Sequence, residues 1–349
     1  MTRPLKRLLV TGGAGFIGSA FIRHLLLSSD FEGKIVNFDL LTYAGKLENL
    51  DGFQNHPRYL FIQGDINHQS LVEKILEEQE IDAIVHFAAE THVDRSISSA
   101  RPFLEANVMG TLSLLEALRK FPHVHFHHIS TDEVYGSLGE SGSFNEHSSY
   151  RPNSPYSASK AASDHLVRAF TQTYRLSTTV SHCSNNYGPG QFPEKFIPLM
   201  IFHCLQGKPL PVYGRGANIR DWLFVDDHAE AIWTILQKGK SGQTYDIGGG
   251  TELSNLELLH LLIDLLAKET KAAPETYRSL IRFVEDRPGH DFRYSIDSSK
   301  IEKELSWKPS ISLEEGLART VRWHLKKSKF YANDKLFAMT LKCLQNKQR

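Results

Sequence analysis

A tyrosine and a lysine stand four residues apart in the string Tyr156-Ser157-Ala158-Ser159-Lys160. Ser154-Pro155 just before them is typical of a helix start, and residues four apart share one face of a helix. An ammonium group beside a phenol favours the phenolate, so a side chain whose ordinary pKa is about 10 becomes a usable base near neutral pH. The pair therefore predicts a tyrosine base, Tyr156, that Lys160 tunes.

Two adjacent acids, Asp132 and Glu133, follow the apolar segment that ends in Ser130-Thr131. Adjacent acids after a strand usually belong to a solvated loop, but the carboxyl ends of parallel strands are where such sheets hold their chemistry. An elimination of water needs one group that takes a proton and another that protonates the leaving hydroxyl. The acid of such a pair must stay protonated, which predicts a pKa raised by burial or by the neighbouring carboxylate.

A glycine-rich turn opens the chain, where Leu9-Val10-Thr11 runs into Gly12-Gly13-Ala14-Gly15-Phe16-Ile17-Gly18. Glycines at this spacing let a strand turn sharply into a helix and let a diphosphate approach the bare backbone. Asp39 ends the next apolar segment, and a carboxylate there accepts hydrogen bonds from ribose hydroxyls but repels a 2′-phosphate. The turn and the acid together predict a dinucleotide site that prefers NAD to NADP.

The elements that must hold these residues alternate between strand and helix in the first half of the chain. The apolar segments expected as strands are 8–11, 34–39, 59–62, 83–87 and 126–130, and the helical stretches are 16–27, 69–78, 101–120 and 155–175. This alternation predicts an α/β fold with a doubly wound, Rossmann-type parallel sheet covered on both faces.

The pattern becomes less regular after about residue 185, where prolines and glycines crowd together. We expect a smaller α/β substrate domain there, interleaved with the last strand or two of the sheet. The predicted division is an NAD-binding domain at 1–185 with a returning segment at about 221–248, a substrate-binding domain at 186–330, and a C-terminal tail at 331–349.

Composition narrows the class of protein. The 349 residues carry 40 basic and 40 acidic side chains, so no long-range attraction to nucleic acid or to an anionic membrane is expected. The three cysteines are far apart and form no metal-binding spacing, and no apolar run is long enough for a signal peptide or a membrane span. We therefore expect a cytoplasmic protein.

Longer strings resemble the extended short-chain dehydrogenase/reductase family, and within it the nucleotide-sugar 4,6-dehydratases, from about residue 6 to about residue 330. Besides the turn, Asp39 and the Tyr156/Lys160 pair, these strings are LTYAG (41–45), AAETHVDRS (88–96), STDEVYG (130–136), SNNYGP (184–189), RDW (220–222) and DRPGHD (286–291).

The resemblance implies an NAD-dependent hydro-lyase that converts dTDP-glucose to dTDP-4-keto-6-deoxyglucose. In this reaction C4 is oxidised, water leaves across C5 and C6, and the hydride returns to C6. The implied roles are Tyr156 as base toward the C4 hydroxyl, Thr131 and Lys160 as its supports, Asp132 as general acid and Glu133 as general base.

The resemblance also implies the binding residues. Those expected at the cofactor, besides Tyr156 and Lys160, are Gly12, Gly15, Phe16, Ile17, Gly18, Asp39, Leu40, Leu41, Thr42, Asp65, Ile66, Phe87, Ala88, Ala89, Ala106 and Asn186. Those expected at the nucleotide-sugar substrate are Thr91, Thr131, Asn185, Lys195, Phe196, Pro211, Val212, Tyr213, Arg220, Asn255, Arg287 and His290. Arginine suits the diphosphate because its planar fork matches phosphate oxygens.

A histidine-rich segment and two apolar helical stretches bear on metal binding and on assembly. His123, His125, His127 and His128 lie close together in the sequence, but no carboxylate or cysteine accompanies them, so we expect no metal site. The helical stretches 101–120 and 155–175 carry apolar residues on more than one face, among them Met109 and Leu112. The resemblance implies that these helices pair with a second copy, so we expect a homodimer.

Several alternatives stay open at this point. A 4,6-dehydratase that acts on UDP-glucose or GDP-mannose shares the chemistry, and no single residue identifies the base. A UDP-sugar 4-epimerase shares the cofactor but does not need Asp132-Glu133. A non-catalytic NAD-binding sensor would not need the intact set of chemical residues.

Overall fold

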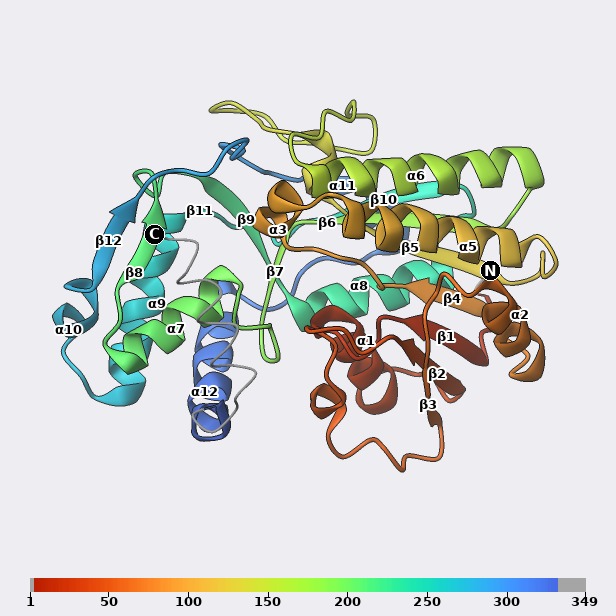
Figure 1. Cartoon of the computed structure of the whole chain (residues 1–349), viewed down its shortest axis with the longest axis horizontal. Helices are drawn as coiled ribbons and strands as arrows, with labels where there is room; N and C mark the ends of the chain where they lie inside the picture. Colours follow the sequence, from red (N-terminus) through yellow and green to blue (C-terminus); the bar gives the residue numbers. More distant parts are fainter. Residues whose placement is uncertain (1–2, 332–349) are drawn as a thin grey trace.

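Seven parallel strands form one sheet in the computed structural model, which describes residues 3–331 (Figure 1). In sheet order these strands are β10 (Gln243–Ile247), β6 (Thr178–Cys183), β5 (His125–Thr131), β4 (Ala83–His86), β1 (Arg7–Thr11), β2 (Lys34–Asp39) and β3 (Tyr59–Gln63). The order reverses direction beside β1, as it does in doubly wound sheets. The predicted α/β, Rossmann-type fold is therefore confirmed.

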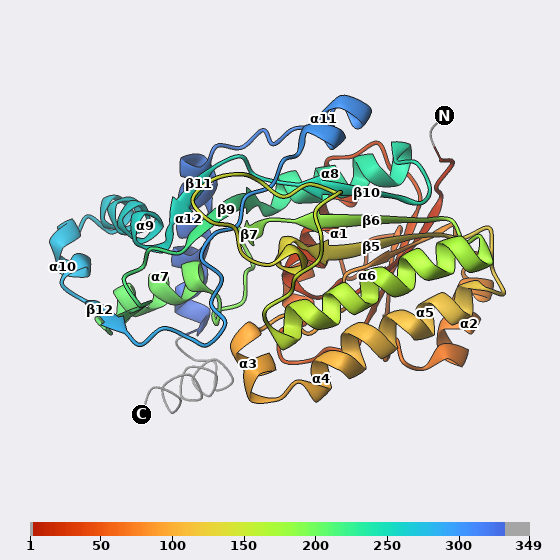
Figure 2. The ribbon, with the colours of Figure 1, turned by 90° about the horizontal axis from the view of Figure 1, so that it is seen from above.

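Helices cover both faces of this sheet (Figure 2). Leu8 and Val10 of β1 belong to the core beneath α1 (Phe16–Leu27) and α8 (Val225–Lys238). Leu9, which points to the opposite face, packs in the core beneath α2 (Gln69–Glu78), α5 (Gly110–Leu118) and α6 (Pro155–Tyr174). This alternation along one strand explains why its residues are apolar throughout.

The helical stretch expected at 101–120 is continuous but not uniform. It consists of α4 (Arg101–Phe103), a π-helical turn η2 (Leu104–Met109) and α5, and α3 (Val93–Ser98) precedes it. Two short 3-10 turns, η1 (Leu47–Leu50) and η3 (Asp132–Tyr135), complete the larger part of the molecule. The turn η3 directly follows β5 and therefore holds the two adjacent acids at the carboxyl end of a central strand.

The smaller part of the molecule lies beside the carboxyl ends of the large sheet (Figure 1). Its helices are α7 (Phe196–Gln206), α9 (Asn255–Thr270), α10 (Pro274–Arg278) and α12 (Leu313–Tyr331). Its strands form a three-stranded sheet of β11 (Glu252–Ser254), β9 (Ile219–Phe224) and β7 (Asn185–Tyr187), and a pair of β12 (Ile281–Val284) and β8 (Leu210–Tyr213). One apolar core joins α7, α9 and α12.

The chain crosses between the two parts more than once. The segment expected to return at about 221–248 begins in the small sheet with β9, continues through α8 over the large sheet, and ends in β10. Much later in the chain, after β12, α11 (Ser299–Leu305) returns to the large sheet and shares a core with residues of β10 and α8. The domain limits themselves stay a prediction, and from residue 332 on the expected tail lies outside the described residues.

Candidate active site

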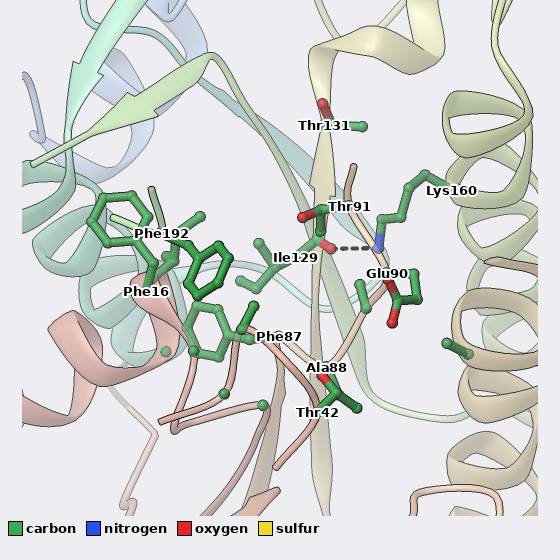
Figure 3. A pocket seen from close by; sticks show the side chains of 18 of the residues that line it. Phe16, Thr42, Phe87, Ala88, Glu90, Thr91, Ile129, Thr131, Lys160 and Phe192 are labelled. Carbon is green, nitrogen blue, oxygen red and sulfur yellow. Dashed lines mark hydrogen bonds between the residues drawn. The ribbon is translucent and has the colours of Figure 1, made fainter. Parts of the chain in front are cut away.

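A cavity of about 510 Å³ opens at the carboxyl ends of the central strands, between the two parts of the molecule. The glycine turn after β1, the ends of β2, β4, β5 and β6, the start of α6 and the segment before α7 all line it. Figure 3 shows Phe16, Phe87 and Phe192 on one side of this space and Lys160 on the other. Ligands of doubly wound sheets bind at this position.

The glycine turn is built so that backbone, not side chains, meets a ligand. Gly12 has a φ of +70°, and a Cβ there would lie 2.5 Å from the backbone N of Ala88. A Cβ on Gly18 would lie 2.4 Å from the carbonyl oxygen of Gly12. Gly15 caps α1 without a side-chain hydrogen bond, which leaves the helix N-terminus open to an anion.

Asp39 lies buried at the end of β2, next to this turn. Its two carboxylate oxygens accept hydrogen bonds from the backbone N–H groups of Ala14 (2.9 Å) and Leu41 (2.8 Å). Burial raises the pKa of Asp39, and these two hydrogen bonds oppose that effect. The carboxylate is therefore fixed in place beside the turn, where the sequence predicted a partner for ribose hydroxyls.

Tyr156 and Lys160 lie on one face of α6, as their spacing in the sequence predicts. Lys160 Nζ donates to the carbonyl oxygen of Ile129 at 2.8 Å (Figure 3) and lies 3.3 Å from His128 Nε2. The pKa of Tyr156 is raised well above its ordinary value, first by burial and then by the negative charge of Glu133. The expectation that Lys160 tunes the pKa of Tyr156 stays a prediction.

Burial acts on Lys160 in the same sense, because it disfavours the charged form. It lowers the pKa of the ammonium group to about 8, and the negative charge of Asp164 opposes this shift. Lys160 is therefore a buried cation whose charge depends on the carboxylate one turn farther along α6.

The acid pair occupies η3 at the edge of the cavity. Asp132 is 2% exposed and accepts a hydrogen bond from Thr131 Oγ1 on one oxygen (3.3 Å). Its other oxygen has no hydrogen-bond partner in the part of the chain that the structure describes. Burial, followed by the charge of Glu133, raises the pKa of Asp132 well above its ordinary value. This direction is the one that a general acid needs.

Glu133 has a different environment from its neighbour. Burial raises its pKa, but three cations, Arg287, Arg220 and Lys195, act in the opposite direction. The surroundings of the two adjacent carboxyl groups therefore differ, because these three cations act on Glu133, whereas the charge of Glu133 itself and that of Asp221 act on Asp132 more strongly than Arg220 does. Such a separation assigns acid and base within a pair.

Most residues expected at the cofactor share this one cavity. All of them line it except Leu41, whose backbone N–H instead holds Asp39. The five residues expected in catalysis line it as well: Thr131, Asp132, Glu133, Tyr156 and Lys160. Their roles stay a prediction, but the fold brings Gly12 and Asn186, which are 174 residues apart in the sequence, into a single site.

Comparison with known proteins identifies the family. The sequence pattern described as GDP-mannose 4,6 dehydratase matches residues 9–320. A dTDP-glucose 4,6-dehydratase from Neisseria gonorrhoeae is 52% identical over 337 residues, which cover 93% of this chain and 97% of the relative. The chain belongs to the dTDP-glucose 4,6-dehydratase family.

Solved structures of family members agree with the fold. The dTDP-glucose 4,6-dehydratase of Streptomyces venezuelae, solved with NAD and a second ligand bound, has a TM-score of 0.86 and 48% identity. The Bacillus anthracis enzyme, solved in complex with NAD, has a TM-score of 0.85 and 45% identity. Each comparison covers 93% of this chain and 98% of the other.

The residues that the family resemblance implies at the substrate divide into two groups. Thr91, Thr131, Asn185 and Lys195 line the cavity, and Lys195 Nζ donates to the carbonyl oxygen of Thr91 at 3.0 Å. The residues outside this lining are Phe196, Pro211, Val212, Tyr213, Arg220, Asn255, Arg287 and His290.

Several members of the second group lie close to one another. Arg287 donates to Asp94 Oδ1 at 3.3 Å, and its Nε is buried without a partner among the described residues. Tyr213 donates to Asp94 Oδ2 at 3.4 Å, and its ring lies edge-on to His290. Arg220 is 5% exposed and lies over the ring of Tyr294. These side chains extend the site from the cavity toward β8 and β12.

Val212 does not fit the expectation of a side-chain contact with substrate. Its side chain is fully buried in the apolar core of the smaller part, because alternate residues of β8 point to opposite faces. A contact of Val212 with a ligand in the site would have to use its backbone. Phe196 is only half-buried and packs against the same core.

Among the lining residues that were not predicted from the sequence are Glu194 and Cys183. Glu194 is buried, accepts a hydrogen bond from Tyr43 (2.9 Å) and pairs with Arg95 at 3.2 Å. Cys183 ends β6 inside the cavity, and burial raises the pKa of its thiol to about 12. No spacing marks either residue, because each reaches the site only through tertiary structure.

The histidine run on β5 has ordinary partners. His125 and His127 lie within hydrogen-bond distance of Thr179 on β6, and His127 Nε2 also lies 3.2 Å from Ser181. Among residues 3–331, no group of three or more histidine, cysteine or acidic side chains is placed to hold a metal ion.

Proposed function

We propose that this chain is an NAD-dependent hydro-lyase that converts dTDP-glucose to dTDP-4-keto-6-deoxyglucose. The reaction oxidises C4, eliminates water across C5 and C6, and delivers a hydride to C6. One observation carries the proposal: a carboxyl pair, Asp132-Glu133, shares a cavity with the Tyr156/Lys160 pair and the glycine turn. The family membership supports it, since the relatives named above bear that activity.

The cavity fits NAD on its own chemistry. A Cβ at Gly12 or Gly18 would fill the cradle, so the backbone is exposed where a diphosphate would lie. The open N-terminus of α1 and the fixed carboxylate of Asp39 suit a diphosphate and a ribose with a free 2′-hydroxyl. When bound, NAD supplies the hydride acceptor at C4 and the hydride donor at C6.

Tyr156 is the residue that removes the proton of the C4 hydroxyl in this proposal. Its pKa is raised in the resting protein, so the phenolate needs positive charge near it. Lys160, one turn farther along α6, is a cation on the same helix face. Thr131, whose hydrogen bond lowers the pKa of Tyr156, helps to hold the phenol oxygen.

Asp132 and Glu133 carry out the elimination. The C4 ketone makes the C5 proton acidic, and Glu133, whose carboxylate faces three cations, takes that proton. Asp132, protonated because it is buried beside Glu133, gives its proton to the departing C6 hydroxyl. The proposal therefore assigns the acid role to the carboxyl group whose pKa is raised further.

The substrate diphosphate needs cations, and a chain of zero net charge must gather them locally. Lys195, Arg220 and Arg287 all oppose the rise in the pKa of Glu133, which supports a group of cations near this carboxylate. We assign the diphosphate to these three side chains, with Arg287 offering a buried Nε that has no hydrogen-bond partner within residues 3–331.

The other activities considered above are less well supported. A 4-epimerase has no step for Asp132 and Glu133, whereas both line the cavity here. A 4,6-dehydratase of another nucleotide sugar would use the same residues, and the curated relatives at about half identity bear the dTDP-glucose name.

The assay that tests the proposal uses purified protein with dTDP-glucose, UDP-glucose and GDP-mannose in parallel. We expect the alkali-absorbing 4-keto product from dTDP-glucose at the highest kcat/KM. A higher kcat/KM with another nucleotide sugar would show that the assigned substrate is wrong. No product from any of the three would show that the chain is a binding protein and not an enzyme.

Two further parts of the proposal concern the setting of the enzyme. We propose a homodimer, because Leu104 and Met109 are 49% and 52% exposed on the outer face of α4, η2 and α5. Within the described part of the chain, the helices are all too short or too polar to cross a bilayer. A location in the cytoplasm stays part of the proposal, to be checked by fractionation.

A further inference from the structure

A buried chain of charged groups lies behind the cavity and takes no part in the mechanism above. His182, 1% exposed on β6, stands between two carboxylates: its Nε2 is 3.0 Å from Asp164 on α6, and its Nδ1 is 2.9 Å from Asp246 on β10. Both carboxylates are also buried. An imidazole with an acid on each nitrogen is held as a cation, because both N–H groups then have acceptors.

The Asp164 end of this chain leads to the Tyr156/Lys160 pair. Asp164 follows Lys160 by one turn and Tyr156 by two turns on the same face of α6. Besides His182, it accepts from Ser130 Oγ at 2.9 Å and Tyr150 OH at 3.1 Å, and its other oxygen lies 3.2 Å from His128 Nε2. These contacts fix the position of α6 against β5 and β6.

The Asp246 end leads to the acid pair. The hydroxyl of Tyr135, the last residue of η3, donates to Asp246 at 3.0 Å and lies 2.8 Å from His182 Nδ1. Its ring is 2% exposed and stacks on Phe144. The turn that begins with Asp132-Glu133 is therefore anchored, three residues later, to the same imidazole that holds α6.

We propose that His182 is a positioning residue that couples the two halves of the catalytic apparatus, holding α6 through Asp164 and η3 through Tyr135. This inference rests on the proposed function, because it assigns the hydride-transfer groups to one arm and the elimination groups to the other. Nothing in the reaction touches His182 itself. It acts by holding α6 and η3 in fixed positions relative to each other, because small displacements of catalytic groups lower the reaction rate strongly.

Charge balance supports this arrangement. Asp164, His182 and Asp246 together carry one net negative charge, which opposes the positive charge of Lys160 across His128. The two carboxylates raise the pKa of His182 to about 10 in spite of burial, whereas burial lowers the pKa of His128 to about 4. Of these two histidines, only His182 is therefore charged at neutral pH. Tyr135 and Tyr150 are the other titratable groups that face it.

The first test measures the protonation state of the His182 ring and does not depend on catalytic turnover. In the NAD-loaded protein with ¹⁵N-labelled histidine, we expect the ring nitrogens of His182 to be doubly protonated up to about pH 9, and Asp164→Asn to lower that limit. A His182 ring that is neutral at pH 7 would overturn the proposal, whatever the substrate of the enzyme proves to be.

The second test separates the two arms by following reduced nicotinamide absorbance and product in single turnovers with dTDP-glucose. Asp164→Asn is expected to slow C4 oxidation about tenfold to a hundredfold, without accumulation of reduced cofactor. Tyr135→Phe is expected to leave oxidation unchanged and to slow elimination about tenfold, so that reduced cofactor accumulates. His182→Gln is expected to slow both steps.

Matched controls separate positioning from general loss of structure. Tyr245→Phe removes a buried hydroxyl from the same strand as Asp246, and Asp227→Asn neutralises a buried carboxylate that holds Ser310 and Ile311 instead. Both controls should keep both steps at the wild-type rate. If Asp164→Asn and Tyr135→Phe slow the same step, or slow neither, His182 does not couple two arms; if the wild type itself fails to turn over, the proposed function fails first.

Discussion

At the scale of single residues, environment gives two adjacent carboxyl groups different tasks. Asp132 is buried beside Glu133, and one of its oxygens has no hydrogen-bond partner among residues 3–331. Both conditions favour its neutral form. Glu133, which faces Arg287, Arg220 and Lys195, has cations to stabilise its charge. The sequence predicted that the acid of the pair would have a raised pKa, but the distribution of cations comes from the smaller part of the molecule.

The acid pair yields a prediction about which step fails. Asp132→Asn and Glu133→Gln should each lower kcat for dehydration by about 10²- to 10⁴-fold, the usual contribution of a general acid or base. Oxidation at C4 should persist, because Tyr156 and Lys160 are untouched. Rapid mixing with dTDP-glucose and detection of the 4-keto-6-deoxy product measure this. Wild-type dehydration by either variant would remove that residue from the mechanism.

At the scale of elements, the strands and helices that carry the site were largely predictable. The helix at 16–27 and the strand at 34–39 have the predicted limits, because the glycine turn and a terminal acid mark their ends. Strand β6 was not predicted, because Thr178, Thr179, Ser181 and His182 make it polar. Its hydroxyl groups are buried against His125 and His127 of β5, a pairing that no local pattern shows.

Within the site, too, contacts between distant parts of the chain could not be predicted from local patterns. The Tyr156/Lys160 spacing locates two residues on one helix face, but it does not show that Lys160 bonds to Ile129. Buried ion pairs such as Asp164 with His182 join residues from different elements and have no signal in the sequence. Local motifs therefore predict which residues meet, whereas their protonation follows from burial and from long-range neighbours.

The glycine turn can be tested as an element. Gly12→Ala places a Cβ 2.5 Å from the backbone N of Ala88 in a residue whose φ is +70°, so the turn must shift. We expect NAD affinity to fall about tenfold to a hundredfold, equivalent to the ~1–3 kcal/mol cost of such strain, measured by calorimetry.

Gly52→Ala is the matched control, because Gly52 has a φ of +90° but its Cβ would meet nothing within 4 Å. It carries the backbone strain without the clash and lies outside the cavity lining. Equal losses of NAD affinity in both variants would show that the close approach at Gly12 is unimportant.

At the scale of the whole molecule, the two exposed apolar side chains of η2, Leu104 and Met109, predict association. Leu104→Glu and Met109→Lys should each raise the dimer dissociation constant at least about tenfold, because charge is placed in a desolvated contact. Sedimentation velocity measures this. Leu27→Lys changes a residue that is 70% exposed elsewhere and should leave the mass unchanged. A wild-type monomer at micromolar concentration would refute the dimer.

The buried cation also gives the whole protein a pH-dependent stability. The pKa of His182 rises from about 6.5 in the unfolded chain to about 10 in the folded protein, so its contribution is complete below pH 6.5 and is lost as pH rises to 10. Urea unfolding should show that His182→Gln costs about 3 kcal/mol at pH 6. The cost should be much smaller at pH 10, and an equal cost at both values would contradict a buried cation.

The account depends on one sequence of events, in which a hydride leaves C4 of the sugar, water departs from C5 and C6, and the same hydride is delivered to C6. The direct measurement uses dTDP-glucose labelled with deuterium at C4 and mass spectrometry or NMR of the product. We expect the deuterium in the C6 methyl group, with a solvent proton at C5. Loss of the label to solvent, or its retention at C4, would contradict the account.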